Sequence, residues 1–247
     1  MADRDKTAPA PRDTRLDPAT TSSRPEIDAF IARARTLAPP VEGGRRGRLI
    51  FALDATMSRQ PTWDTACKLQ GEMFRETAAV GGLDVQLAYF RGLNECRVSR
   101  WVSDGAGLGD LMARIGCQGG HTQIGKILKH ARAECQKAKV QALVYVGDAM
   151  EEPIDDLAAA AGELALLGVP AFVFQEGHDP VAENAFREIA RLTRGAYCGF
   201  DLSAAHELAE LLRAAAVYAA GGVKALADLS ARRDAGARKL LTQMGPR

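Results

Sequence analysis

The chain has 247 residues, of which 47% are hydrophobic and 26% charged, and its formal net charge is +1. This composition supports one α/β domain of about 200 residues with extensions, and the near-neutral charge gives no electrostatic support for nucleic acid or a membrane as a partner. The single basic cluster, Arg45-Arg46-Gly47-Arg48, is expected to be a solvated linker. Five scattered cysteines without a CxxC pair, no secretory segment and no apolar run of roughly 18 residues predict a cytoplasmic protein.

Changes in composition divide the chain into four parts. Residues 1–24 are rich in Pro, Thr, Ser, Asp and Arg, which predicts a disordered tail. An N-terminal helix and a linker are expected within 25–47, and the main domain within 48–220. After Gly221-Gly222, residues 221–247 are expected to form a C-terminal helical extension.

Within the main domain, strand and helix patterns alternate. The segments 84–90 and 96–102 are strands joined by a loop too short for a parallel crossover, which predicts an antiparallel hairpin. The other expected strands are 49–54, 142–146, 171–175 and 197–200, and the expected helices are 63–79, 108–115, 123–137, 155–167, 182–194, 204–218 and 223–243. This order predicts a doubly wound, Rossmann-like α/β fold: a mostly parallel sheet with one antiparallel edge strand and helices on both faces.

Oxygen-bearing side chains gather where these strands are expected to end. They are Asp54, Thr56 and Ser58 after the first strand, Thr122 after a Gly-Gly-His turn, and Asp148 after the strand at 142–146. In open α/β sheets, ligands bind beyond the carboxyl ends of the strands, and hard cations prefer such oxygen ligands. The five residues therefore predict a site for Mg²⁺, which would also suit Mn²⁺ or Ca²⁺. Each residue also has an ordinary structural role, with Asp54 or Thr122 as a helix cap and the hydroxyls as turn formers.

The three-part pattern Asp54-x-Thr56-x-Ser58, Gly119-Gly120-His121-Thr122 and Val146-Gly147-Asp148 resembles the metal-ion-dependent adhesion site of von Willebrand factor type A domains. The resemblance covers about residues 48–218 and is closest to bacterial cytoplasmic members. It departs from the family at Thr56, where serine is commoner, and at Ala149, where many members have glycine.

This resemblance implies a protein-binding module rather than an enzyme. Thr56 and Ser58 would bind the metal directly, Thr122 would do so in the ligand-occupied state, and Asp54 and Asp148 would act mainly through metal-bound water. An Asp or Glu side chain of a protein partner would complete the coordination. The oligomeric state, the partner and the cation used in vivo are not specified by the sequence.

Other interpretations remain open or are weaker. The same fold with a vestigial metal site would act as a structural or assembly subunit, and an Asp54-dependent phosphohydrolase would lack the second acid usually found at the position of Thr56. Gly120–Ile127 approaches a phosphate-binding loop, but Ile127 replaces the required hydroxyl and Gly125-Lys126 is expected inside a helix. Ser58 has no glycine elbow of the hydrolase type. The acids Glu151-Glu152 and Asp155-Asp156 either form a second cation site or belong to a helix start enriched in acids.

Overall fold

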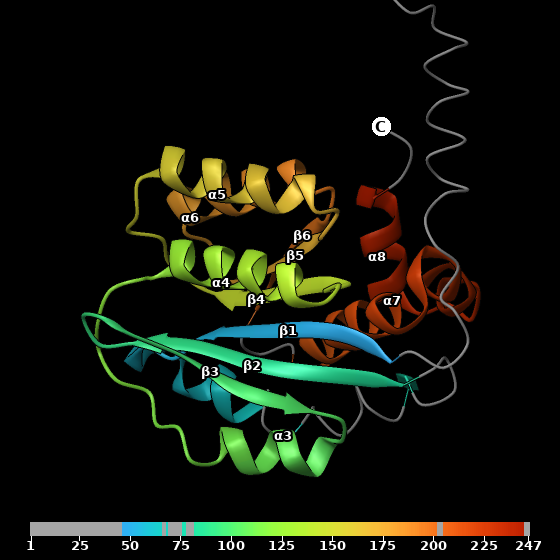
Figure 1. The fold of residues 1–247 in the computed structure, drawn as a ribbon, viewed down its shortest axis with the longest axis horizontal. Coiled ribbons are helices and arrows are strands. Elements are labelled where there is room, and N and C mark those ends of the chain that lie inside the picture. Colours follow the sequence, from blue (N-terminus) through green and yellow to red (C-terminus); the bar gives the residue numbers. More distant parts are fainter. Residues whose placement is uncertain (1–45, 66–67, 69–75, 78–81, 202–204, 245–247) are drawn as a thin grey trace, which may run out of the picture. The chain divides into compact units, whose positions relative to one another are not determined.

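The computed structural model of the chain describes residues 46–65, 68, 76–77, 82–201 and 205–244 (Figure 1). The expected tail, the expected N-terminal helix and most of the expected helix at 63–79 lie outside these residues. The described residues all belong to one compact unit. In the described part of the chain, no helix is both long and apolar enough to cross a membrane.

A six-stranded sheet forms the centre of the domain, in the order β3-β2-β1-β4-β5-β6. The strands are β1 (Gly47–Asp54), β2 (Leu83–Arg91), β3 (Glu95–Val102), β4 (Ala142–Gly147), β5 (Ala171–Glu176) and β6 (Ala196–Phe200). All neighbours pair in parallel except β2 and β3, which form the expected antiparallel hairpin at the edge. The predicted doubly wound, mostly parallel sheet is confirmed.

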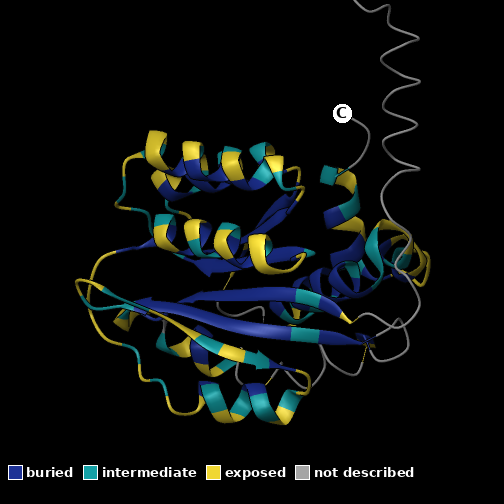
Figure 2. Cartoon of the chain, in the orientation of Figure 1, coloured by how far each residue is buried: buried dark blue, intermediate teal, exposed yellow. Residues whose placement is uncertain are grey.

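Helices cover both faces of this sheet because its central strands are buried and mostly apolar on both sides, as in β1, β4 and β5. Leu49, Phe51 and Leu53 of β1 face one core, and the alternate residues Ile50 and Ala52 face the other. The first core is covered by the helices α3 (Gly105–Met112), α7 (Ala205–Ala231) and α8 (Ala235–Met244). The second core, on the opposite face of the sheet, is covered by α4 (Ile124–Lys137), α5 (Ile154–Leu166) and α6 (Pro180–Leu192). Figure 2 shows the buried strands between helices whose outer sides are exposed.

Local capping moves two helix starts away from the positions expected from hydrophobic periodicity. α3 begins three residues early because Asp104 Oδ1 accepts a hydrogen bond from the Gly107 amide at 2.7 Å. α6 begins at Pro180 because Asp179 accepts from the amides of Val181 and Ala182. In both cases a carboxylate satisfies free N–H groups of the first turn.

The C-terminal extension does not form the single helix that was expected. α7 continues to Ala231 across a kink at Gly222, whose φ of 68° is readily adopted by glycine. Arg233 then takes a φ of 68°, and Asp234 Oδ1 accepts from the Ala237 amide at 2.7 Å to start α8. Ala237 and Leu240 are buried in the same core as β1, so α8 packs on the domain.

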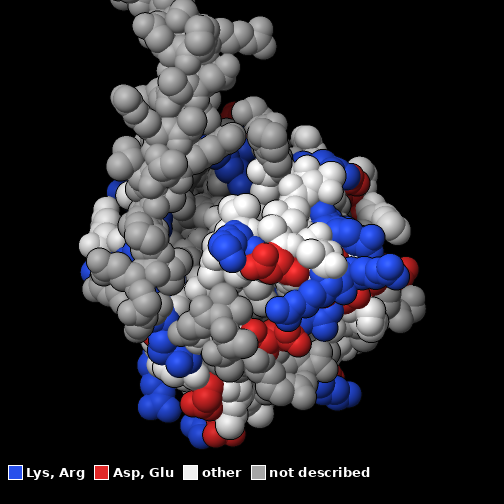
Figure 3. All heavy atoms as spheres, turned by 90° about the vertical axis from the view of Figure 1, so that its right-hand side faces the viewer, with Lys and Arg blue, Asp and Glu red and all other residues white. Residues whose placement is uncertain are grey.

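Of the basic cluster, Arg45 lies outside the described residues, Arg46 is exposed but ion-paired, and Arg48 belongs to β1 rather than to the expected linker. Arg46 pairs with Asp84 at 2.6 Å, and Arg48 pairs with Glu134 at 3.1 Å while its guanidinium lies 4.0 Å from the centre of the Trp101 ring. Figure 3 shows that on this side of the molecule, opposite the carboxyl ends of the parallel strands, basic side chains lie next to acidic ones.

Candidate metal centre

The ends of β1 and β4 place two carboxylates at one edge of the sheet. The two strands are parallel neighbours, with Leu53 of β1 in register with Val146 of β4. Asp54 is the last residue of β1 and is 2% exposed, and Asp148 follows β4 directly and is half-buried. The two carboxylates therefore follow neighbouring parallel strands.

The backbone after β1 holds the first part of the three-part pattern, the motif Asp54-x-Thr56-x-Ser58, in a tight turn. The Asp54 carboxylate accepts a hydrogen bond from the Thr56 amide at 2.7 Å, and the chain then enters a short 3₁₀ helix, Met57–Arg59. A carboxylate that bonds the amide two residues ahead fixes such a turn. The turn thus brings the hydroxyls of Thr56 and Ser58 close to each other, with their oxygens 3.3 Å apart.

Ser58 connects the first motif to the third. Its hydroxyl donates to Asp148 Oδ2 at 2.9 Å, across 90 residues of sequence. Asp54, Thr56, Ser58 and Asp148 are thus linked through a chain of hydrogen bonds at the carboxyl edge of the sheet. Hydroxyl and carboxylate oxygens are the donor types that Mg²⁺ and other hard cations prefer, so the chemistry of this set fits such an ion.

Thr122 lies on the adjoining loop and is tied to the segment that follows Asp148. It is buried, its hydroxyl accepts from the Glu151 amide at 3.0 Å, and its own amide donates to Glu151 Oε2 at 3.0 Å. The expectation that Thr122 caps the next helix is wrong, because the N-cap of α4 is Gln123. The two hydrogen bonds between Thr122 and Glu151 instead hold the second motif, which ends at Thr122, close to the third, which ends at Asp148.

The acidic pair Glu151-Glu152 caps a helix from a distance. The Glu152 carboxylate accepts from the amides of Ile124 and Gly125 in the first turn of α4, while Glu151 also contacts His121 Nδ1 at 3.1 Å. Four N–H groups at a helix start need acceptors from outside the helix, and negative charge is favourable there. Of the two alternatives for these acids, the contacts support the role at a helix start, and the helix is α4.

Removing the Glu152 carboxylate should lower the free energy of unfolding by about 1–2 kcal/mol, because two amides of α4 lose their acceptor. We expect this loss in Glu152→Ala by urea unfolding. The matched control is Asp155→Ala, which removes an exposed acid from the first turn of α5. Equal stability losses in the two variants would contradict the capping role.

Backbone hydrogen bonds hold the loops around the motifs together. The Ala55 amide donates to the Phe90 carbonyl at 3.0 Å, and the Ala55 carbonyl accepts from Gln118 at 2.9 Å. The His121 amide donates to the Gly92 carbonyl in the β2–β3 turn at 3.1 Å. The site therefore rests on four connected loops rather than on one flexible segment.

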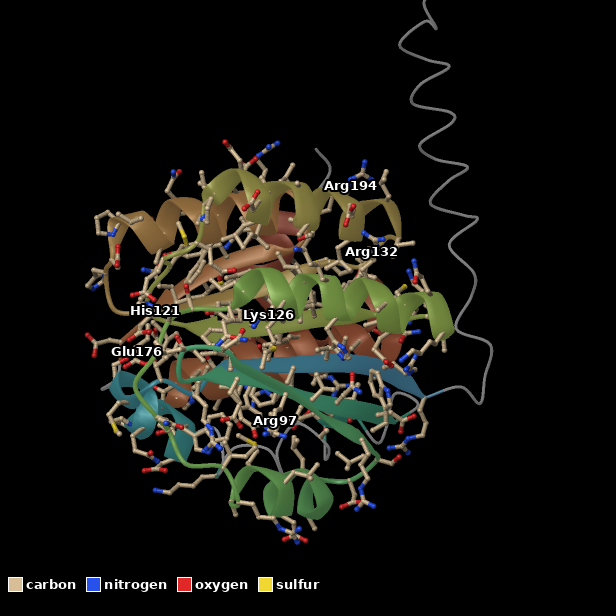
Figure 4. All side chains as sticks on the ribbon, turned by 60° about the vertical axis from the view of Figure 1, so that its left-hand side comes forward. Arg97, His121, Lys126, Arg132, Glu176 and Arg194 are labelled. Carbon is tan, nitrogen blue, oxygen red and sulfur yellow. The ribbon has the colours of Figure 1, made fainter. Side chains whose placement is uncertain are left out.

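One buried acid at this edge was not identified from the sequence. Glu176 ends β5, is 6% exposed, and accepts a hydrogen bond from the hydroxyl of Thr62, just beyond the first motif. Figure 4 shows Glu176 and His121 at the same end of the sheet. A signal was available, because Glu176 follows an apolar strand as Asp54 does, but nothing in the sequence pairs it with Thr62.

Two further observations bear on the chemistry of the site. Within the described residues, no group of three or more His, Cys, Asp or Glu side chains is arranged to hold a metal, so a site here would depend on the hydroxyls as well as the carboxylates.

Gly125 and Lys126 lie in the first turn of α4, as expected, and the Lys126 ammonium is hydrogen-bonded to Asn94 and Gln123. This placement is not that of a phosphate-binding loop, which follows a strand.

No protein-family model and no curated protein matches the sequence. Solved structures do match. One is the structure of proximal thread matrix protein 1 from the mussel byssus, in which zinc occupies the metal-ion-dependent adhesion site motif. This protein is 17% identical to the chain, and the two structures match with a TM-score of 0.60. The match covers 79% of this chain and 53% of that chain. A von Willebrand factor type A protein from Catenulispora acidiphila is 17% identical with a TM-score of 0.54, over 69% of this chain and 43% of that chain.

A third similar structure is the von Willebrand factor A domain of SpRpn10, 12% identical with a TM-score of 0.53, over 66% of this chain and 95% of that domain. At these identities the similarity establishes the fold. The predicted von Willebrand factor type A fold is confirmed.

Proposed function

We propose that this chain, which has the von Willebrand factor type A fold, is a protein-binding module that captures a partner's Asp or Glu side chain through a divalent cation, Mg²⁺ in the first place. The cation would be held by Asp54, Thr56, Ser58, Thr122 and Asp148. When bound, the cation supplies an open coordination position for the partner's carboxylate. The function is recognition, with no reaction catalysed.

The observation that carries this proposal is the hydrogen bond from the Ser58 hydroxyl to Asp148 at 2.9 Å. It joins oxygen groups from two distant motifs at the edge where this class of sheet binds ligands. The mussel protein, whose structure holds zinc at its motif, supports the assignment of a metal to such a site in this fold.

Each residue contributes to binding in a distinct way. The Thr56 and Ser58 hydroxyls offer neutral oxygens, so the site keeps positive charge with which to attract a carboxylate. Asp54 fixes the turn through the Thr56 amide, and Asp148 orients the Ser58 hydroxyl. Thr122, held by Glu151, supplies a hydroxyl from the adjoining loop.

Calorimetric titration with Mg²⁺ and Mn²⁺ tests the site. We expect saturable binding by the wild type, and a loss of about tenfold or more in affinity in Asp148→Asn, because the amide lacks the charge and accepts less well from Ser58. Asp155→Asn, an exposed acid outside the site, should bind as the wild type does. Absence of metal binding by folded wild type would overturn the proposal and favour a structural or assembly subunit with a vestigial site.

Two further assays separate the remaining alternatives. Capture of a protein partner in Mg²⁺ that is released by a chelator supports the module. Turnover of p-nitrophenyl phosphate that disappears in Asp54→Asn would instead support the phosphohydrolase and contradict the absence of catalysis.

A further inference from the structure

A pocket of about 650 Å³ lies at the open edge of the sheet, away from the candidate metal centre. β6 is the last strand in the sheet order, and α8 lies beside it (Figure 1). The pocket is lined by residues of α6, β6 and α8, among them Arg187, Tyr197, Gly199, Arg238, Lys239 and Gln243. Its size is within the range of about 300–1,000 Å³ for ligand sites.

The pocket is positively charged. Arg187 of α6 and Arg238 and Lys239 of α8 line it, and none of the described lining residues is acidic. Arg187 pairs with Glu183 at 2.7 Å, and Lys239 lies 3.9 Å from Glu207. Exposed ion pairs of this kind contribute only about 0–1 kcal/mol, so the basic groups remain free to bind an incoming anion.

Among the described residues, the outer side of β6 is bonded at Tyr197, which pairs with a side chain of α8. The Gln243 side-chain amide accepts from the Tyr197 amide at 2.8 Å and donates to the Tyr197 carbonyl at 2.6 Å, as a neighbouring strand would. Because alternate residues of a strand direct their backbone groups to the same side, Gly199 faces the same open edge. Gly199 is exposed, and a Cβ there would meet only the Tyr197 hydroxyl, at 3.6 Å.

The pocket is equipped for binding rather than for covalent chemistry. Burial raises the pKa of the Cys198 thiol to about 11, so the thiol stays protonated near neutral pH and is a poor nucleophile. The Arg187 guanidinium lies 4.3 Å from the centre of the Tyr197 ring, a cation–π contact that holds it over the strand.

We propose that this pocket binds an extended acidic peptide segment of a partner protein. The peptide backbone pairs with Gly199 at the edge of β6, and an Asp or Glu side chain or a terminal carboxylate lies among Arg187, Arg238 and Lys239. Adding a strand to an open sheet edge is an established form of peptide recognition, in which the backbone supplies affinity and side-chain pockets supply specificity. This interaction needs no cation, which distinguishes it from the proposed metal-dependent site.

A peptide-display selection tests the proposal. A library of random peptides is selected on the full chain in the presence of EDTA, and the double variant Arg238→Gln/Lys239→Gln is kept out of the selection. The strongest peptide is then synthesised with a fluorescent label and, separately, with N-methylated backbone amides. Binding is measured by anisotropy to the wild type, to the double variant and to the control Lys129→Gln/Lys224→Gln, which removes two exposed cations elsewhere.

We expect the selected peptides to be enriched in Asp and Glu, to lose about tenfold or more in affinity for Arg238→Gln/Lys239→Gln, and to retain it for the control. N-methylation should abolish binding, because the peptide can no longer pair with the strand. A pool without acidic enrichment, equal binding to the double variant, or equal binding of the N-methylated peptide would each overturn the proposal. Binding to phosphatidylserine vesicles in place of peptide would do the same. The outcome is independent of the metal site, since EDTA is present throughout.

Discussion

Thr56→Val should lose Mg²⁺ binding while keeping the fold intact. Valine has the shape of threonine without the hydroxyl, and the extended backbone at this residue, with φ of −70° and ψ of 163°, suits a β-branched side chain. The substitution therefore removes one oxygen, 3.3 Å from that of Ser58, and little else. We expect the affinity for Mg²⁺ in calorimetry to fall by about tenfold or more, while the free energy of unfolding changes by less than about 0.5 kcal/mol.

Thr56→Ser is the matched control, because serine keeps the hydroxyl and removes only a methyl group. We expect this variant to bind Mg²⁺ within a few-fold of the wild type. If valine and serine bound the cation equally well, the Thr56 hydroxyl would not be a ligand. If both lost binding, side-chain packing rather than the oxygen would be responsible.

The fold was predictable because its strands carry strong local signals. β1 and β4 are apolar runs that each end at an acid or just before one, and the short loop between β2 and β3 permits only a hairpin. The motif residues could be placed at one edge because parallel strands share a carboxyl end. The neighbouring positions of β1 and β4 are a finding of the structure, because a shared carboxyl edge does not by itself determine the order of the strands.

What could not be predicted depends on contacts between distant segments. Glu152 caps α4 rather than its own helix, and no pattern in the sequence joins residues 27 or 28 positions apart for that purpose. The break between α7 and α8 at Arg233 and Asp234 has the same origin. Asp234 is bound by Arg213, which stabilises a turn inside a segment whose apolar spacing alone suggests one helix.

Neighbouring glycines of the second motif also look alike in the sequence but differ in the structure. A Cβ built on Gly120 would lie 2.0 Å from the Gly92 carbonyl oxygen and 2.4 Å from the Gly92 Cα, whereas one on Gly119 would meet nothing within 4 Å. The contact at Gly120 is with backbone, so relief requires movement of the β2–β3 turn or of the loop itself. The same loop carries Thr122.

Gly120→Ala should therefore both destabilise the domain and weaken metal binding. Forcing a methyl group into a filled space costs about 1–3 kcal/mol, and shifting the loop also moves Thr122, which is proposed to contribute its hydroxyl to the site. Urea unfolding measures the first effect, and Mg²⁺ calorimetry at a temperature where the variant is folded measures the second. Because Thr122 is expected to bind the cation directly only in the ligand-occupied state, we expect the Mg²⁺ affinity without a partner to fall by only a few-fold. The Mg²⁺-dependent capture of a partner should fall by about tenfold or more.

Gly119→Ala is the control for this prediction, since its methyl group enters open space and its φ lies outside the left-handed region. We expect stability within about 0.5 kcal/mol of the wild type and unchanged Mg²⁺ affinity. A destabilised Gly120→Ala that binds Mg²⁺ normally would show that Thr122 contributes little to the cation in the absence of a partner. If the chelator-sensitive capture of a partner by Gly120→Ala were also unchanged, Thr122 would not be a ligand in either state.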